Sequence, residues 1–466
     1  MLEKAVKQAF VCYGGYMKRS STTNMTQGNP TMLLLSFAVP MFIGNIFQQM
    51  YSLADSIIVG QFLGSSALAA IGTTGSVTFL FFSICNGIAS GSGIVASQCY
   101  GAGDPAQTKR AIANAAYIMF IASMVMSVVS YIAAPWALTV MGTPAEILPD
   151  AVVYMRMSCI GVPLVAVYNY SSSMLRALGD SRTPLYFLIV SCILNIGLDL
   201  LCVYVWEMGV FGAALATIIA QVIAGLGCLL YAVRSNPYFH LSREDFTPDK
   251  QIIGRAVRLG LPLAMQWSMV ALSTSALQAF VNSFGADAMA AFTAANRVEH
   301  LVHLPYGSIS AALATYAGQN YGAGNIGRVK DGLKHGMLIS AVFTAVIMVA
   351  YQLFSEPIMR MFVKETAVIE IGAQALRLTS WFYIFLALIN MCRGILNGIG
   401  DALFAFINGV VEVICRIGLP MLVVLIPGVG MWGIWWTAGV TWAISGLSCL
   451  LRYFTWRRKV SAKLAA

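Results

Sequence analysis

Long apolar segments separated by short polar ones make up most of this chain. Twelve of these segments have about 20 residues or more, the length that crosses a lipid bilayer. Their approximate bounds are 32–58, 67–95, 110–135, 151–175, 184–206, 210–233, 254–283, 288–316, 333–354, 368–396, 402–426 and 431–455. A backbone inside lipid must satisfy its own hydrogen bonds, which favours helices. The pattern predicts an all-α integral membrane protein with twelve transmembrane helices.

The second half of the chain repeats features of the first half at a fixed offset of 221 residues. QCYGAG at 98–103 returns as QNYGAG at 319–324, and LRALGD at 175–180 returns as LNGIGD at 396–401. Matches at one offset indicate two copies of one scaffold. Six spans bring the chain back to its starting side, so both copies share one orientation. We therefore expect two pseudo-symmetric six-helix bundles related by an axis along the membrane normal.

This pattern divides the chain into five parts. They are a cytoplasmic N-terminal leader (1–30), an N-terminal six-helix bundle (31–233), a cytoplasmic linker (234–252), a C-terminal six-helix bundle (253–456) and a basic cytoplasmic tail (457–466). Both Met1 and Met25 are candidate start residues, because Met25 directly precedes the polar residues before the first span.

Composition and charge agree with a membrane protein. Hydrophobic residues make up 58% of the chain and charged residues 10%, whereas soluble domains carry roughly 25% charged residues. The net charge of +9 comes from Lys and Arg concentrated in the termini and in alternate loops. Positive charge marks the cytoplasmic side. We expect a multi-pass protein of the cell inner (plasma) membrane with both termini cytoplasmic, and no nucleic-acid partner.

Four of the 19 acidic residues lie inside predicted spans: Asp55, Asp199, Glu299 and Glu412. A carboxylate there costs about 2.5–3.5 kcal/mol on insertion scales, so each one is a functional candidate. Glu412 has a structural explanation, because Arg416 follows four residues later and favours an ion pair on one helix face. Glu299 is expected in a hydrogen-bonded polar cluster that lines a cavity, since its neighbouring histidines do not have the spacing of a zinc motif.

Asp55 and Asp199 have no basic residue one helical turn away. Both are expected in the outer half of the membrane, at a depth similar to that of Thr217, and Asn195 lies one turn from Asp199. Oxygen ligands of this kind suit sodium, and a proton suits them too. Two nearby carboxylates resist double ionisation. The alternative is that the aspartates pair with distant arginines such as Arg156.

The second half of the chain lacks this set of residues. At the 221-residue offset, Asp199 aligns with Pro420, Asn195 with Arg416 and Thr217 with Ala438. A purely structural role would be expected to recur, so the difference favours function. Pro40 and Pro262, in contrast, occupy matching places in the first span of each half. A proline removes a helical hydrogen bond and can kink the helix, so Pro40 is either a static bend or a hinge.

Taken together, these residues resemble the multidrug and toxic compound extrusion (MATE) transporters, over about residues 26–456. The shared features are the twelve spans, the Pro40-to-Asp55 spacing, the QxYGAG turns, and Asn195-x-x-x-Asp199 with Thr217 in the next helix. The match is closest to the prokaryotic branch related to DNA-damage-inducible protein F. That branch implies a cation-coupling site at Asp55, Asn195, Asp199 and Thr217, with sodium as one candidate ion at the two aspartates. It also implies a cavity lined by Gln49, Tyr154 and Asn169.

The resemblance implies a secondary active multidrug efflux antiporter, not an enzyme. It would exchange organic compounds, expected to be cationic, for sodium ions or protons by alternating access, with Pro40 as a hinge. Its partners would be small organic molecules and membrane lipid, with no cofactor and no obligate protein partner.

The main alternative is a flippase of the same superfamily that moves a lipid-linked saccharide. It would require a basic cavity, and Arg156, Arg297, Arg377, Arg393 and Arg416 all lie within predicted spans. A passive channel is a further alternative.

Overall fold

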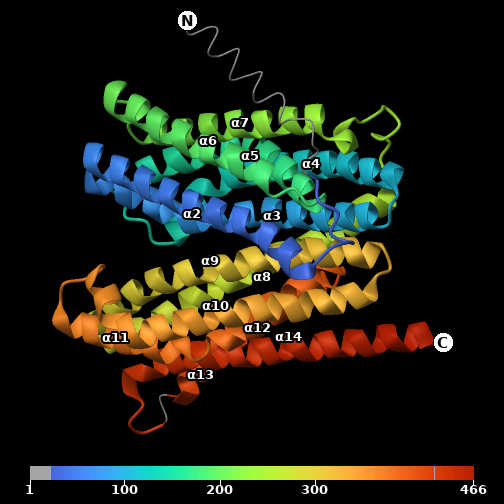
Figure 1. Ribbon diagram of the computed structural model, residues 1–466. Helices are drawn as coiled ribbons and strands as arrows, with labels where there is room; N and C mark the ends of the chain where they lie inside the picture. Colours follow the sequence, from blue (N-terminus) through green and yellow to red (C-terminus); the bar gives the residue numbers. More distant parts are fainter. Residues whose placement is uncertain (1–21, 424–425, 466) are drawn as a thin grey trace, which may run out of the picture. The chain divides into compact units, whose positions relative to one another are not determined.

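The computed structural model describes residues 22–423 and 426–465, so most of the predicted leader lies outside the described residues. Helices account for nearly all of the described chain (Figure 1). The long ones are α2 (Pro30–Phe62), α3 (Gly64–Gly101), α4 (Pro105–Val140), α5 (Leu148–Ala177), α6 (Arg182–Asp199), α7 (Gly209–Ser235), α8 (Lys250–Val281), α9 (Ala286–Gly322), α10 (Ile326–Arg360), α11 (Thr366–Ser380), α12 (Tyr383–Gly398), α13 (Ala402–Val423) and α14 (Gly433–Ala465). The prediction of an all-α membrane protein is confirmed.

Nine helices in the described chain are individually long and apolar enough to cross a bilayer. Helices α11 and α12 form a tenth span that is bent by 53° at the break between them. The two remaining long helices, α8 and α9, carry more polar residues, among them Arg297 and Glu299 in α9. Each of the twelve predicted spans overlaps one of these twelve helical segments.

These helices form two compact units. The first contains Ile43–Val257 and the described residues before Met25, and the second contains Met25–Phe42 and the chain from Arg258 onward. The chain therefore passes from the second unit to the first inside α2, between Phe42 and Ile43, two residues after Pro40. It returns inside α8. The sequence-based boundaries at 31–233 and 253–456 stay a prediction.

Corresponding helices pack together within each unit. In the first unit α5 contacts α3, α4 and α7, and α6 contacts α7. In the second unit α12 contacts α9, α10 and α14, and α13 contacts α14. Each unit thus builds its core around a helix of the fourth span in its half of the chain.

Small residues allow the closest of these contacts. In the first unit Ser173 of α5 donates a hydrogen bond of 2.6 Å to the carbonyl of Ala89 in α3. In the second unit Ser310 of α9 donates one of 2.8 Å to the carbonyl of Asn390 in α12. Ser310 aligns with Ala89 at the 221-residue offset, so the serine comes from the opposite partner in the two units. Close backbone approach of this kind is typical of helix packing in membranes.

The glutamines that open the two QxYGAG sequences hold the first turns of α8 and the segment before α2. In the first unit Arg255 donates a hydrogen bond of 2.7 Å to the side-chain oxygen of Gln98. In the second unit the backbone N–H of Met25 donates one of 2.8 Å to the side-chain oxygen of Gln319. Asn114 fixes the linker to the first unit, because its side-chain oxygen accepts from the N–H of Asp249 at 2.9 Å. These turns organise the scaffold.

Candidate functional site

The first unit brings four predicted site residues together. Asp55 lies in α2, Asn195 and Asp199 lie in the last turns of α6, and Thr217 lies in α7. Asn195 and Asp199 are completely buried. The amide of Asn195 donates a weak hydrogen bond of 3.4 Å to the hydroxyl of Thr217. The two carboxyl groups of Asp55 and Asp199 are electrostatic neighbours.

The helix changes its geometry directly after Asp199. The chain continues as a π-helix, η1 (Leu200–Val205), in which Trp206 donates its N–H to the carbonyl of Leu201 at 2.9 Å. Such wide turns are rare and are often found at functional sites. Here the junction between the two helix types lies at the buried aspartate.

Several oxygens of this cluster are buried without a hydrogen-bond donor. They are Oδ1 of Asp55, both carboxyl oxygens of Asp199 and Oδ1 of Asn195. Buried polar atoms nearly always have a partner, since losing water without replacement is costly. A cation would supply the missing partner. Sodium prefers oxygen ligands of these types, and a proton would bridge or neutralise the two carboxyl groups, so the residues present fit either ion.

Arginine does not neutralise this pair in the described chain. No Lys or Arg nitrogen lies within 4.0 Å of Asp55 or Asp199 among the described residues. Arg156, the partner considered in the alternative, instead places its guanidinium 5.0 Å from the ring centre of Tyr131. The structure contradicts that alternative.

Two tyrosines complete the cluster. Tyr51 and Tyr154 are both electrostatic neighbours of Asp55 and Asp199, and the hydroxyl of Tyr51 donates to Thr217 at 3.3 Å. Tyr154 was predicted to line the cavity. Tyr51 was missed, although it lies one helical turn before Asp55 and so shares its face.

The other predicted cavity residues have different surroundings. Gln49 is exposed and Asn169 is half-buried, and no contact recorded for the described residues joins either of them to the aspartates. Glu299 belongs to the second unit, where it is buried and accepts a hydrogen bond of 3.3 Å from the hydroxyl of Tyr383. Its role and those of Gln49 and Asn169 stay predictions.

The expected pairing of Glu412 with Arg416 is wrong. Glu412 accepts a hydrogen bond from Arg393 of α12 at 2.5 Å and another from Ser445 of α14 at 3.1 Å. Arg393 also donates to Asn408, one turn before Glu412. Glu412 and Arg416 lie one turn apart in α13, as the sequence indicates. The carboxylate of Glu412 nevertheless binds an arginine of the neighbouring helix.

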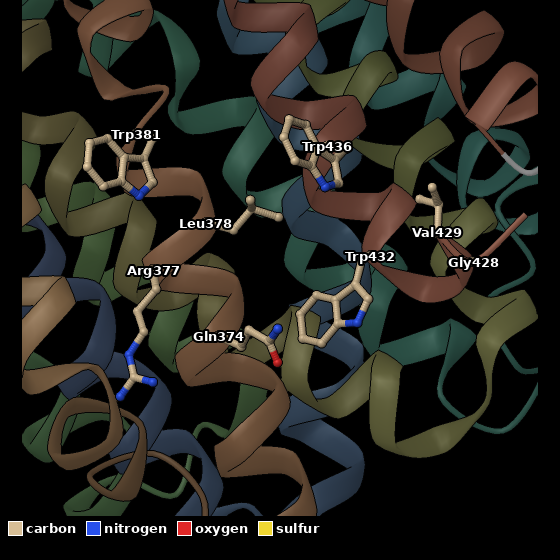
Figure 2. Close-up of a pocket in the computed structure, with 8 residues that line it drawn as sticks. All are labelled: Gln374, Arg377, Leu378, Trp381, Gly428, Val429, Trp432 and Trp436. Atoms are coloured by element: carbon tan, nitrogen blue, oxygen red, sulfur yellow. The ribbon is translucent and has the colours of Figure 1, made fainter. Parts of the chain in front are cut away.

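Two hollows in the second unit have no predicted site residue in their linings. The larger, of about 460 Å³, is lined by Gln374, Arg377, Leu378, Trp381, Gly428, Val429, Trp432 and Trp436. Figure 2 shows the tryptophans around this space, whereas the guanidinium of Arg377 extends away from it; Arg377 binds Glu356 at 3.0 Å. Tryptophans near helix ends are typical of the membrane interface.

Comparison with known proteins identifies the family. A family model described as MatE matches residues 40–201 and again residues 262–422. The chain belongs to the MatE family. The two matched ranges together contain every predicted cation-coupling residue except Thr217.

Relatives in the MatE family include named transport and resistance proteins. The chain is 28% identical to the "Probable multidrug resistance protein YoeA" of Bacillus subtilis, over 92% of this chain and 94% of the relative. It is 26% identical to the "FAD transporter" of Shewanella oneidensis, over 90% of this chain and 93% of the relative. The first name describes drug resistance and the second describes a transporter.

Solved structures of MATE proteins share this fold. One described as "MATE in the bent conformation" has a TM-score of 0.87 and 23% identity, and the match covers 95% of this chain and 98% of that one. At this identity the likeness establishes the fold alone. The multi-pass membrane architecture therefore rests on the family, the fold and the apolar helices together.

Proposed function

We propose that this protein exports organic cations by antiport with sodium ions or protons. The observation that carries the proposal is the pair of half-buried Asp55 and fully buried Asp199. Three of their four carboxyl oxygens are buried without a hydrogen-bond donor, and no Lys or Arg of the described chain pairs with them. The multidrug resistance names of the relatives support the export of varied compounds. We place the protein in the inner membrane with both termini cytoplasmic, following the distribution of Lys and Arg.

Cation binding would change the charge of the pair. Without a cation, two ionised carboxylates repel each other in a buried site. A sodium ion or proton removes this repulsion and draws α2 and α6 toward each other. The hydrogen bond from Tyr51 to Thr217 links the same part of α2 to α7. A change at the aspartates would therefore move the outer half of α2.

Pro40 is well placed to permit that movement. It lies two residues before the point at which α2 passes from one unit to the other. Because proline removes one helical hydrogen bond, a helix bends more readily there than elsewhere. We assign Pro40 as the hinge that lets the outer part of α2 respond to the cation while its first turns stay with the second unit.

The energy available is sufficient for concentrative export. One charge that moves down a potential of 100 mV releases about 2.3 kcal/mol, and every 1.4 kcal/mol corresponds to about a tenfold concentration ratio. A single coupling cation therefore supports a substrate concentration ratio of between about tenfold and a hundredfold across the membrane.

Transport in proteoliposomes tests this function. The purified protein is reconstituted, and a cationic rhodamine methyl ester is followed by fluorescence while sodium and pH gradients are imposed separately. Dye movement against its gradient under one of these conditions is expected. Dye movement that ignores both gradients would indicate a passive pathway, and movement of a lipid-linked saccharide instead of the dye would indicate the flippase.

A further inference from the structure

Arg416 lies deep in a span but has few partners. Its Nη1 donates a hydrogen bond of 3.1 Å to the hydroxyl of Thr274 in α8, and its Nε is buried without an acceptor. The expected partner, Glu412, is already bound by Arg393. Since a guanidinium carries five N–H donors, Arg416 retains most of its capacity to bind an acceptor.

The charged groups around Arg416 balance one another. Arg416 interacts electrostatically with Glu412, Glu299, Arg393 and His303. Glu412 offsets Arg393, to which it is bound. Glu299 is the remaining negative charge, but its recorded hydrogen bond comes from Tyr383, and no ion pair within 4.0 Å joins it to Arg416 in the described chain. The positive charge of Arg416 is thus compensated by Glu299 at a distance and not by a carboxylate in direct contact.

The position of Arg416 corresponds to that of the cation cluster in the other unit. Arg416 aligns with Asn195 at the 221-residue offset. Both Arg416 and Thr274 lie seven residues before the ends of their helices, α13 at Val423 and α8 at Val281, as Asp55 does before the end of α2 at Phe62. At 1.5 Å per residue each lies about 10 Å from its helix end. The scaffold carries carboxylates at this depth in one unit and a guanidinium in the other.

The surroundings of Arg416 favour access from water. Arg416 is half-buried and Thr274 is exposed, so the guanidinium reaches the surface of its unit. A guanidinium that faced lipid at this depth would carry a large free-energy cost. This cost favours a hydrated position for the face that holds Thr274 and Arg416.

From these observations we infer that Arg416 binds an anionic group, a carboxylate or a phosphate, on transported compounds. The planar fork of a guanidinium matches both groups with two parallel hydrogen bonds. The unit that lacks the aspartate pair would then select substrates that carry a negative charge in addition to a cationic centre. This inference rests on the proposed transport function, and Arg416 would determine specificity within it.

A matched pair of dyes tests the assignment. The rhodamine methyl ester is a monocation, and the corresponding free acid is a zwitterion of nearly the same size. Binding of each dye to the purified full-length protein in detergent is measured by fluorescence anisotropy. Arg416→Gln is expected to weaken binding of the free acid by about tenfold, the loss typical of a charged hydrogen bond, and to change binding of the ester less than twofold. Arg416→Lys should restore part of the loss.

Several results would overturn the assignment. Equal weakening of both dyes would indicate a structural role for Arg416, and unchanged binding of both would exclude a contact with the anion. Arg377→Gln is the control, because Arg377 already has Glu356 as its partner. If added phosphatidylglycerol binds in an Arg416-dependent way while the free acid does not, the site holds a lipid headgroup and not a solute. Binding needs no gradient, so failure of the antiport experiment with Arg416-dependent binding intact would remove the proposed function alone.

Discussion

The hydroxyl of Tyr51 donates a hydrogen bond of 3.3 Å to the hydroxyl of Thr217, and this bond joins α2 to α7 beside the two aspartates. Thr217 also accepts from the amide of Asn195 at 3.4 Å. One hydroxyl therefore connects three helices at the candidate cation site. The arrangement couples the position of α2 to that of the residues that would bind the ion.

Removing this connection should slow transport without abolishing it. A hydrogen bond between neutral groups contributes about 0.5–1.5 kcal/mol, so Tyr51→Phe and Thr217→Ala should each lower the initial rate of ester transport by about two- to tenfold. The double variant should lose little more than Thr217→Ala alone, because that variant already removes the bond from Tyr51. Tyr204→Phe is the control, since Tyr204 is exposed and contacts Phe62 through its ring. Additive losses would contradict the shared role.

The two aspartates should be indispensable for coupling. Asn has nearly the shape of Asp but carries neither the negative charge nor the titrating proton, so Asp55→Asn and Asp199→Asn should each reduce gradient-driven transport to the level of protein-free liposomes. Asp287→Asn, at an exposed position in the first turn of α9, should transport at the parental rate. If either site variant keeps the parental rate while folded in the membrane, the cation site lies elsewhere.

The buried ion pair in the second unit should respond differently from a half-exposed one. The side chains of Arg393 and Glu412 are 12% and 6% exposed, whereas those of Arg377 and Glu356 are 41% and 46% exposed. Breaking a buried pair leaves an uncompensated charge and costs about 3–5 kcal/mol, whereas an exposed pair contributes about 0–1 kcal/mol. Glu412→Gln should therefore lower the thermal unfolding midpoint in detergent far more than Glu356→Gln. Equal shifts would contradict the burial of the Arg393–Glu412 pair.

Sequence periodicity was sufficient to predict the helices, because each span needs about 20 apolar residues whatever its neighbours. It was also sufficient to select Asp55, Asp199, Asn195 and Thr217, since buried acids without local counter-charges are rare. Contacts between helices were not predictable in this way. Arg393 lies 19 residues from Glu412 in the chain, and no pattern within a single helix indicates that pairing.

The repeated Gly-Asp turns illustrate the same limit. Because both turns recur, the sequence favours a structural role for Asp180 and Asp401. The structure gives them different partners: Asp180 accepts from the N–H and hydroxyl of Thr183, whereas Asp401 accepts from Arg452 at 2.7 Å. A shared sequence position predicted the kind of role but not the partner, which depends on how the neighbouring helices pack.

Close packing at Gly398 gives a further prediction that depends on the structure alone. A Cβ atom at Gly398 would lie 2.4 Å from the carbonyl oxygen of Ala314 and 2.7 Å from the Cβ of Ala317, both in α9. Backbone atoms cannot move aside as a flexible side chain can, so Gly398→Ala must push α12 away from α9. Overpacking of this kind costs about 1–3 kcal/mol, and the thermal unfolding midpoint in detergent should fall.

Gly418→Ala is the matched control, because a Cβ at Gly418 in α13 would meet no atom within 4 Å. Alanine favours a helix interior over glycine by about 1 kcal/mol, so this variant should unfold at the parental temperature or above it. A larger loss at Gly418 than at Gly398 would mean that α9 and α12 do not approach as closely as the structure has them.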